Sequence, residues 1–145
     1  MTGDGKASGI MSDHLKDIPP AAHLLGREII SVDANSGEVK LRYTARGEFA
    51  NRHGTVQGGM LAAMLDSATG NAVMAGLPSH LTAVTTRLDT QFLKPAGLGE
   101  IVATARVMRR DDRSAEVFAE LADSAGQIVA TARAELRIRA RQPRS

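Results

Sequence analysis

The middle of the chain, residues 57–75 (QGGMLAAMLDSATGNAVMA), has no proline and many small or straight-chain apolar residues, so it predicts one long helix. The apolar positions of this helix do not form a single stripe. They go around most of the cylinder and include Met60, Leu61, Met64 and Leu65. A helix of this kind has to be buried on nearly all sides. The rest of the chain must therefore form a layer that wraps it.

The segments on both sides of this helix have the alternating or β-branched pattern of strands. Residues 28–34 and 38–45 flank Asn35-Ser36-Gly37, which is a hairpin signal. After the helix, strand-like segments separated by short turn-forming breaks cover residues 81–93, 100–109, 115–122 and 128–138. We expect these four segments to form an antiparallel meander. With the hairpin, they predict an α+β fold in which a curved antiparallel β-sheet of five or six strands wraps around one long central helix.

The length of 145 residues fits one domain. Residues 1–18 mix Gly, Ser, Asp and Lys without periodicity, and we expect them to be a mobile leader. Residues 19–140 are expected to form the domain, and residues 141–145 a short C-terminal tail. At the start of the domain, residues 21–25 predict a short helical turn that ends at Gly26.

Composition excludes several classes of protein. Apolar residues make up 43% of the chain and charged residues 23%, which is typical of a folded globular protein. The net charge is only +2, and one Tyr, three Phe and no Trp leave few side chains on which bases could stack, so we expect no nucleic-acid partner. The absence of cysteine excludes disulfides, thiolate metal sites and a cysteine nucleophile. A polar N-terminus and the lack of an apolar run of about 20 residues predict no membrane association and a cytoplasmic location.

The sequence also lacks the usual signals for a cofactor or a metal ion. Residues 54–59 are rich in glycine, but they contain neither the Gly-Lys-Ser/Thr of a phosphate-binding loop nor the spacing of a dinucleotide fingerprint. The histidines show no ligand spacing and no carboxylate cluster beside them; they are His14, His23, His53 and His80. We therefore expect no cofactor and no metal ion.

The start of the long helix is a candidate binding site. Gly58 and Gly59 place backbone amides there with no side chain in the way. The first amides of a helix have no acceptor within the helix, so they attract developing negative charge. The alternative is that the two glycines only let the helix pack closely against the sheet. The residues alone favour neither interpretation.

Asp66 is a candidate catalytic residue. It lies in the middle of the helix, in a segment that we expect to be buried. A buried carboxylate is costly unless it is paired or takes part in chemistry. The alternative is that Asp66 faces a wet groove or interacts with the backbone around Ser67 and Thr69.

The spacing of Gly58 and Asp66 limits how they can act together. They are eight residues apart, which separates them by about 12 Å along one helix. One small substrate group cannot touch both. If both belong to one site, Gly58 comes from one subunit and Asp66 from another whose helix runs antiparallel beside it. A two-fold dimer with two shared sites follows.

Two segments resemble the hotdog-fold acyl-CoA thioesterases of the phenylacetate-pathway, or PaaI-like, type. The first is the run from Asn51 to Gly59 (NRHGTVQGG) followed by Asp66. The second is the segment 83–96 (AVTTRLDTQFLKPA), which is similar to the family's strand after the helix and ends in an aromatic-x-x-Pro-Ala turn. The resemblance runs from about Gly26 to Arg139.

The resemblance implies roles for individual residues. Gly58 donates its amide to the thioester carbonyl, Asp66 acts as nucleophile or general base, and Asn51 holds water or substrate. Thr85 matches a Ser/Thr that assists the attacking water. The residues implied to contact substrate are Gln57, Gly59, Met60 and Phe92. The family usually has His where this chain has Gln57, and an amide cannot transfer that proton.

The resemblance also implies an acyl-CoA substrate and a homodimer, with further association into a dimer of dimers. His53 is interpreted as a solvated or structural histidine. Four basic residues near the strand ends could meet the phosphates of coenzyme A but are interpreted as solvated turn residues; they are Lys94, Arg109, Arg110 and Arg113. Two other functions are considered. One is a non-catalytic acyl-CoA-binding hotdog module, and the other is a hotdog hydratase or dehydratase, which would want a histidine beside Asp66. The sequence does not identify the acyl or aryl group.

Overall fold

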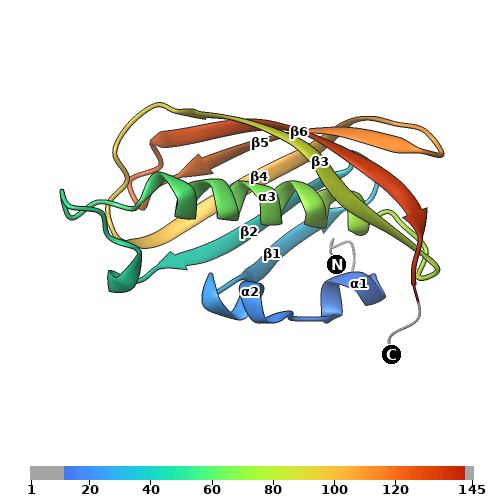
Figure 1. The fold of residues 1–145 in the computed structure, drawn as a ribbon, viewed down its shortest axis with the longest axis horizontal. Helices are drawn as coiled ribbons and strands as arrows, with labels where there is room; N and C mark the ends of the chain where they lie inside the picture. The colour runs from blue at the N-terminus through green and yellow to red at the C-terminus, as the bar shows by residue number, and fades with distance from the viewer. Residues whose placement is uncertain (1–11, 143–145) are drawn as a thin grey trace.

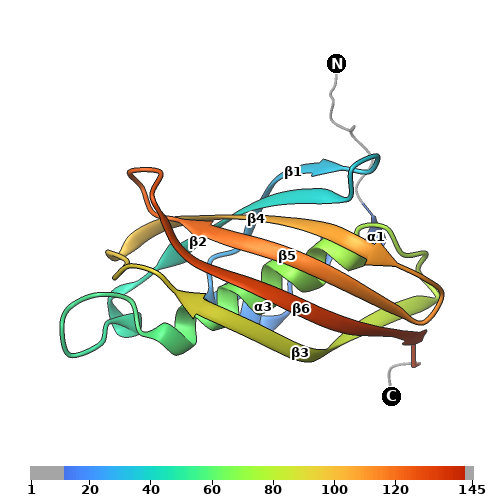
Figure 2. The same cartoon turned by 90° about the horizontal axis from the view of Figure 1, so that it is seen from above.

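The computed structural model describes residues 12–142, in which one long helix lies against the concave face of a six-stranded sheet (Figure 1). The helical elements are α1 (Asp13–Lys16), α2 (Pro20–Leu24), the 3₁₀ turn η1 (Gly47–Phe49) and α3 (Gly58–Met74). The strands are β1 (Glu28–Asp33), β2 (Glu38–Ala45), β3 (Leu81–Phe92), β4 (Gly99–Arg110), β5 (Ser114–Ala122) and β6 (Ile128–Ala140). Figure 2 shows the strands crossing over α3.

The predicted hairpin is confirmed as β1 and β2. The carboxylate of Asp33 accepts the amides of Asn35 and Ser36, at 3.0 and 3.3 Å, and Gly37 takes a φ of +71° that other residues rarely adopt. Alternate residues of β2, from Val39 to Ala45, point into the core and are buried. The turn and the period of two therefore act together to set the register.

The strand order differs from the expected meander. The order in the sheet is β1-β2-β4-β5-β6-β3, so β4, β5 and β6 form a meander, but β3 pairs with β6 and not with β4. The chain leaves β3 at one edge and crosses to β4, and the amide of Val56 binds the carbonyl of Ala96 in this connection at 2.8 Å. The expectation that all four strands follow one another in the sheet is wrong. Alternation indicates which face of a strand is buried, but it does not indicate which strand lies beside it.

Only one side of α3 is covered by this chain. The side toward the sheet is buried and carries Met64, Leu65, Ala68 and Ala72. The opposite side, which we call the open stripe, is exposed or half-exposed and consists of Gly59, Ala63, Asp66 and Gly70. A Cβ atom built on Gly59 or Gly70 meets no atom within 4 Å. The expectation that α3 is buried on nearly all sides is therefore wrong within one chain.

The N-terminal part of the domain packs beside α3. The predicted turn is confirmed as α2, and Gly26 follows it with a φ of +65°. Part of the expected leader is folded, because Asp13–Lys16 forms α1 and Leu15 is buried. The Oγ of Ser12 caps α1 and also lies 3.4 Å from the carbonyl of Met74 at the end of α3. Residues 1–11 and 143–145, which hold the rest of the expected leader and tail, lie outside the described residues.

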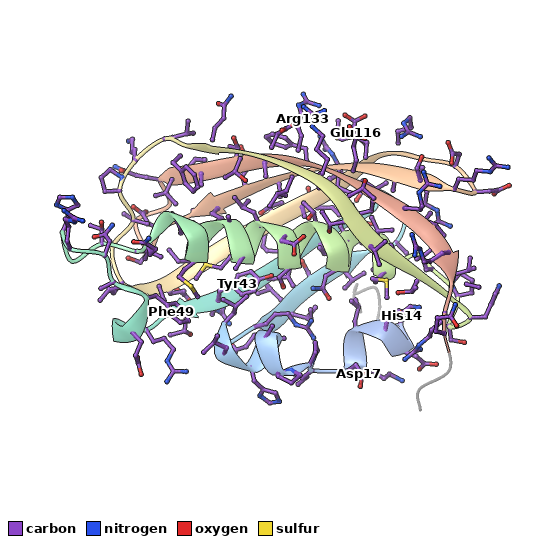
Figure 3. The ribbon with its side chains drawn as sticks, in the orientation of Figure 1. His14, Asp17, Tyr43, Phe49, Glu116 and Arg133 are labelled. Atoms are coloured by element: carbon purple, nitrogen blue, oxygen red, sulfur yellow. The ribbon has the colours of Figure 1, made fainter. Side chains whose placement is uncertain are left out.

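The face of the sheet turned away from α3 carries charged side chains. Arg133 on β6 lies 3.5 Å from the carboxylate of Glu116 on β5, and its guanidinium is 5.9 Å from the ring centroid of Phe118 (Figure 3). The curved antiparallel sheet with one long helix confirms the predicted α+β class and the hotdog arrangement that the resemblance implies. None of the helices within residues 12–142 has the length and apolar character needed to cross a bilayer.

Candidate functional site

The first turn of α3 presents unpaired backbone amides. The carbonyl of Gln57 accepts the amides of Met60 and Leu61, at 2.9 and 3.2 Å, which starts the helix without a side-chain cap. Within residues 12–142, the amides of Gly58 and Gly59 have no hydrogen-bond acceptor. Two N–H donors at the positive end of a helix can therefore bind an oxygen atom that gains negative charge.

Gly58 lies under an aromatic ring. A Cβ atom added to Gly58 would be 3.5 Å from the ring of Phe92, which is 54% exposed at the end of β3. Gly59 has open space where a side chain would be, so close packing within this chain does not require a glycine there. Gln57 is exposed, and its own amide donates to the carbonyl of Phe49 at 2.8 Å, while Met60 packs against the core.

Asn51 closes the loop before α3. Its Oδ1 accepts the amides of His53 and Thr55, at 2.9 and 3.2 Å, and its Nδ2 donates to the Oγ1 of Thr55 at 3.0 Å. The carboxamide is thus largely occupied in holding residues 51–55 in a turn. His53 itself is exposed.

Asp66 and Thr85 are in direct contact. The hydroxyl of Thr85 on β3 donates to Oδ1 of Asp66 on α3 at 2.8 Å. Both residues are exposed in the single chain, so the expectation that Asp66 is buried is wrong. The reason is that Asp66 belongs to the open stripe and that β3 covers only one flank of it. The carboxylate is held in one orientation by a neutral donor and stays accessible.

A second group of polar side chains, which the sequence pattern did not reveal, lies next to this pair. The buried Tyr43 on β2 donates to the Oγ of Ser67 at 2.8 Å, and the Nδ2 of Asn71 donates to the carbonyl of Ser67 at 2.7 Å. Arg27 then donates to the Oδ1 of Asn71 at 3.2 Å. Burial raises the pKa of Tyr43 well above its usual value, so its hydroxyl remains a donor. Ser67 and Asn71, two polar residues in a mainly apolar helix, were the signal that the sequence offered for this group.

Asp66 and Thr85 line a cavity of about 570 Å³ between the α1–α2 segment, α3 and β3. Figure 3 shows Tyr43 beside α3, with His14 and Asp17 on the α1 segment below it in this view. The polar residues that line the cavity include Asp17, Arg27, Asp66, Ser67, Asn71 and Thr85. Its apolar walls include Ala22, Leu25, Ala63, Met74, Ala83 and Leu136.

The structure therefore places the expected site residues in two groups. Asp66 and Thr85 form one group on the cavity. The other group surrounds the first turn of α3, does not line that cavity, and consists of Asn51, Gln57, Gly58, Gly59, Met60 and Phe92. Both Gly58 and Asp66 belong to α3, so the helix itself keeps the two groups about 12 Å apart along its axis.

The remaining candidates lie away from both groups or interact locally. The Nζ of Lys94 donates to Gln127 at 3.3 Å, beside the β5–β6 turn. At the β4–β5 turn, Arg109 pairs with Asp111 at 3.1 Å, while Arg110 donates to the carbonyl of Gly76 at 3.0 Å. Within residues 12–142, no three His, Asp or Glu side chains are grouped as a metal ion would need.

Comparison with known proteins gives a consistent result. A family model described as the thioesterase superfamily matches residues 53–130. A solved structure from Ralstonia eutropha JMP134, named as a thioesterase and phenylacetic acid degradation-related protein, is 39% identical, with a TM-score of 0.81 over 83% of this chain and 91% of that chain. The E. coli PaaI protein from the phenylacetic acid degradation operon is 26% identical, with a TM-score of 0.77 over 86% of this chain and 87% of that chain.

A curated relative from Halobacterium salinarum, named as an esterase, is 37% identical over 82 residues. The match covers 53% of this chain and 54% of the relative, so this chain spans about half the length of that protein.

Proposed function

Because the chain belongs to the thioesterase superfamily and has the hotdog fold of a PaaI-like thioesterase, we propose that it hydrolyses the thioester bond of an acyl-CoA. The observation that carries this proposal is the Thr85–Asp66 hydrogen bond of 2.8 Å on the open stripe of a helix whose first amides are unpaired. A positioned carboxylate and an oxyanion-binding helix end are the two groups that thioester hydrolysis needs.

The two groups act on one thioester when two chains associate. A second copy whose α3 runs antiparallel along the open stripe brings its Gly58 close to Asp66 of the first chain. The small size of Gly59, Ala63 and Gly70 allows such close approach, and β3 is an edge strand on which Val84 and Phe92 are 40% and 54% exposed. The active unit in this proposal is a homodimer with two shared sites, and two such dimers form the tetramer that the family resemblance implies.

The chemistry begins at the carbonyl. The Gly58 amide of one subunit donates to the thioester oxygen, which makes the carbonyl carbon more electrophilic. Asp66 of the other subunit, oriented by Thr85, takes a proton from water as the water oxygen bonds to the carbonyl carbon. The C–S bond then breaks, and the thiolate of coenzyme A receives that proton. The products are the free acid and the coenzyme A thiol.

A covalent route uses the same residues. In that route an Asp66 oxygen attacks the carbonyl carbon, coenzyme A leaves, and water hydrolyses the resulting anhydride. A single turnover in H₂¹⁸O identifies the covalent route when water attacks the aspartyl carbon, because that attack leaves ¹⁸O in Asp66, whereas attack on the acyl carbon labels the product in either route. Labelled product with unlabelled Asp66 is the result expected for the general-base route.

The residues around the first turn complete the site in this proposal. Asn51 holds the loop that positions Gln57, and Gln57 contacts the substrate through an amide that cannot transfer a proton. Gly59 leaves room for the thioester, while Met60 and Phe92 contact the acyl-CoA beside Gly58.

The test is hydrolysis of a panel of short-chain, long-chain, aromatic and hydroxylated acyl-CoAs. The chain has no cysteine, so a thiol reagent reports only released coenzyme A. Turnover that depends on Asp66 supports the proposal. Tight binding of acyl-CoA without release of thiol would contradict it and would favour a binding module.

A further inference from the structure

Arg27 lines the cavity beside Asp66, and no carboxylate within residues 12–142 forms an ion pair with it. It lies between α2 and β1 and is half-buried. Its guanidinium donates to the Oδ1 of Asn71 at 3.2 Å and to the backbone carbonyl of Asp17 at 2.8 Å, and its Nε is buried without an acceptor. Among the ion pairs of residues 12–142, none involves Arg27.

A partly buried guanidinium without a carboxylate is unusual. Removing the charge from water is costly, and neutral carbonyls repay less of that cost than a carboxylate does. Arg27 presents five N–H groups, of which two have acceptors in the structure. The remaining donors favour an anionic ligand with two oxygens.

Arg27 lines the same cavity as the candidate catalytic pair, Asp66 and Thr85. Asp66, Thr85 and Arg27 all line the same space of about 570 Å³. Asn71, which binds Arg27, follows Asp66 by five residues, which is about 7.5 Å along α3. On α3, Ser67 and Gly70 lie between them, and the apolar walls of the cavity include Ala63, Met74 and Ala83. The cavity thus has a reactive region at Asp66, a cationic region at Arg27 and apolar walls that an acyl chain can contact.

Other polar residues also line the cavity, among them Asn71, Asp17 and Arg141. The Nδ2 of Asn71 is a donor and is already bound to Ser67, while its oxygen is bound to Arg27. Asp17 contributes its backbone carbonyl, not its carboxylate, to Arg27. Arg141 lines the same cavity and adds a second cation. A hydroxyl at the far end of a ligand could accept from Arg27, but it would not neutralise the charge.

We propose that the substrate is the monothioester of a dicarboxylic acid, and that Arg27 binds the free carboxylate at the far end of the acyl chain. This proposal rests on the proposed thioesterase function, because it takes the cavity beside Asp66 as the acyl site. Arg27 is then a specificity-determining residue: it selects the acyl group and does not touch the reacting carbonyl.

The test compares matched substrates that differ only at the far end. Adipoyl-CoA and hexanoyl-CoA have the same number of carbons, and the first ends in a carboxylate while the second ends in a methyl group. The pair is repeated with four and eight carbons. We expect kcat/KM to be at least about tenfold higher for the dicarboxylic member at the best length, since a charge-assisted hydrogen bond is gained. A native protein that prefers the methyl-ended member at every length overturns the proposal.

The variant Arg27→Met removes the charge and keeps a long side chain. We expect it to lower kcat/KM for adipoyl-CoA about thirtyfold more than for hexanoyl-CoA, with Arg27→Lys between the two. An equal loss on both substrates would give Arg27 only the structural role of holding the α1–α2 segment, and would overturn the proposal. The comparison on the native protein remains decisive if Arg27→Met does not fold.

Binding measurements test this proposal independently of the proposed hydrolytic function. On an Asp66→Asn background, calorimetry with the same two thioesters should show tighter binding of adipoyl-CoA, and Arg27→Met should abolish the difference. Equal affinities overturn the proposal even if the native protein hydrolyses thioesters. Conversely, an Arg27-dependent preference supports it even if no thioester is turned over. An Arg27-dependent preference for 4-hydroxyphenylacetyl-CoA over adipoyl-CoA would show that the site binds a neutral hydroxyl, and it would overturn the proposal that Arg27 binds a carboxylate.

Discussion

Leu65 and Asp66 are neighbours in the sequence and point about 100° apart around α3, but they have different surroundings. Leu65 is fully buried against the sheet with Met64 and Ala68. Asp66 is exposed on the open stripe and accepts one hydrogen bond, from Thr85. The buried side stabilises the domain, and the open stripe carries the candidate chemistry. One helix can have both functions because the residues on its two sides contact different parts of the molecule.

The largest expected effect is on the open stripe. Asp66→Asn keeps the size of the side chain and its ability to accept from Thr85, but it removes the base or nucleophile. We expect thioester turnover to fall by about a hundredfold or more, with an unchanged melting temperature. Initial rates of thiol release and thermal unfolding measure the two effects. Near-native kcat in a folded Asp66→Asn protein would exclude Asp66 from the reaction.

The buried side should respond in the opposite way. Leu65→Ala leaves a cavity under α3, and we expect it to lower the free energy of unfolding by about 2–5 kcal/mol while turnover per folded molecule changes little. Denaturant titrations at one fixed protein concentration measure the loss. Leu65→Met is the matched control and should cost less than about 1.5 kcal/mol. A stable but inactive Leu65→Ala protein would remove the distinction between the two sides.

Substitutions of Thr85 test how much the orientation of Asp66 contributes to kcat. Thr85→Ala removes the 2.8 Å hydrogen bond, and we expect kcat to fall by about tenfold because the carboxylate and its water lose their orientation. Thr85→Ser keeps the hydroxyl and should retain most of the rate. A loss larger than that of Asp66→Asn would show that the two roles are reversed.

The shared site can be tested by mixing two inactive variants. Gly58→Val places methyl groups against the ring of Phe92, which is 3.5 Å from the position of a Cβ atom, and blocks the amide. Gly58→Val and Asp66→Asn chains that are unfolded together and refolded should recover about a quarter of native activity, because half of the dimers are hybrid and each has one intact site. No recovery, in a mixture in which mass spectrometry detects the hybrid, would place both residues in one subunit's site.

The smallest expected effect is at the N-cap. Gln57→His introduces the family's usual residue at an exposed position that no proton transfer in the mechanism requires. We expect an intact fold and a change in kcat/KM within about fivefold on the best acyl-CoA. A gain of several hundredfold would show that the native protein is an impaired enzyme or a binder.

Several features of the fold could be read from local pattern. The prediction of the hairpin depended on Asn35-Ser36-Gly37 and on the alternation in β2. The prediction of α3 depended on a proline-free run of helix-forming residues. The pairing of β3 with β6 could not be predicted, because any strand with a period of two fits beside another. The contact of Thr85 with Asp66 follows from that pairing, which places β3 beside the open stripe.

The candidate site, like the fold, could be predicted from the sequence only in part. The motif from Asn51 to Gly59 and the eight-residue spacing from Gly58 to Asp66 were enough to predict that Gly58 and Asp66 lie on one helix, about 12 Å apart, and the structure has both on α3. The exposure of Asp66 was one of two alternatives that the sequence left open, and the position of Arg27 on the cavity was not predictable. Ala63 and Ala68 are equally small and apolar, so only the position of the sheet decides which of them is buried.

The long helix, the strands, their order along the chain and the residues able to perform chemistry could be inferred from local sequence, since they depend on neighbours within a few positions along the chain. Long-range packing sets which side of α3 stays open, which strand lies beside Asp66, and that Arg27 lines the same cavity. These features depend on contacts between segments far apart in sequence, such as the 44 residues that separate Arg27 from Asn71. Local propensity carries no information about such contacts, because they form only when the whole sheet has closed around the helix.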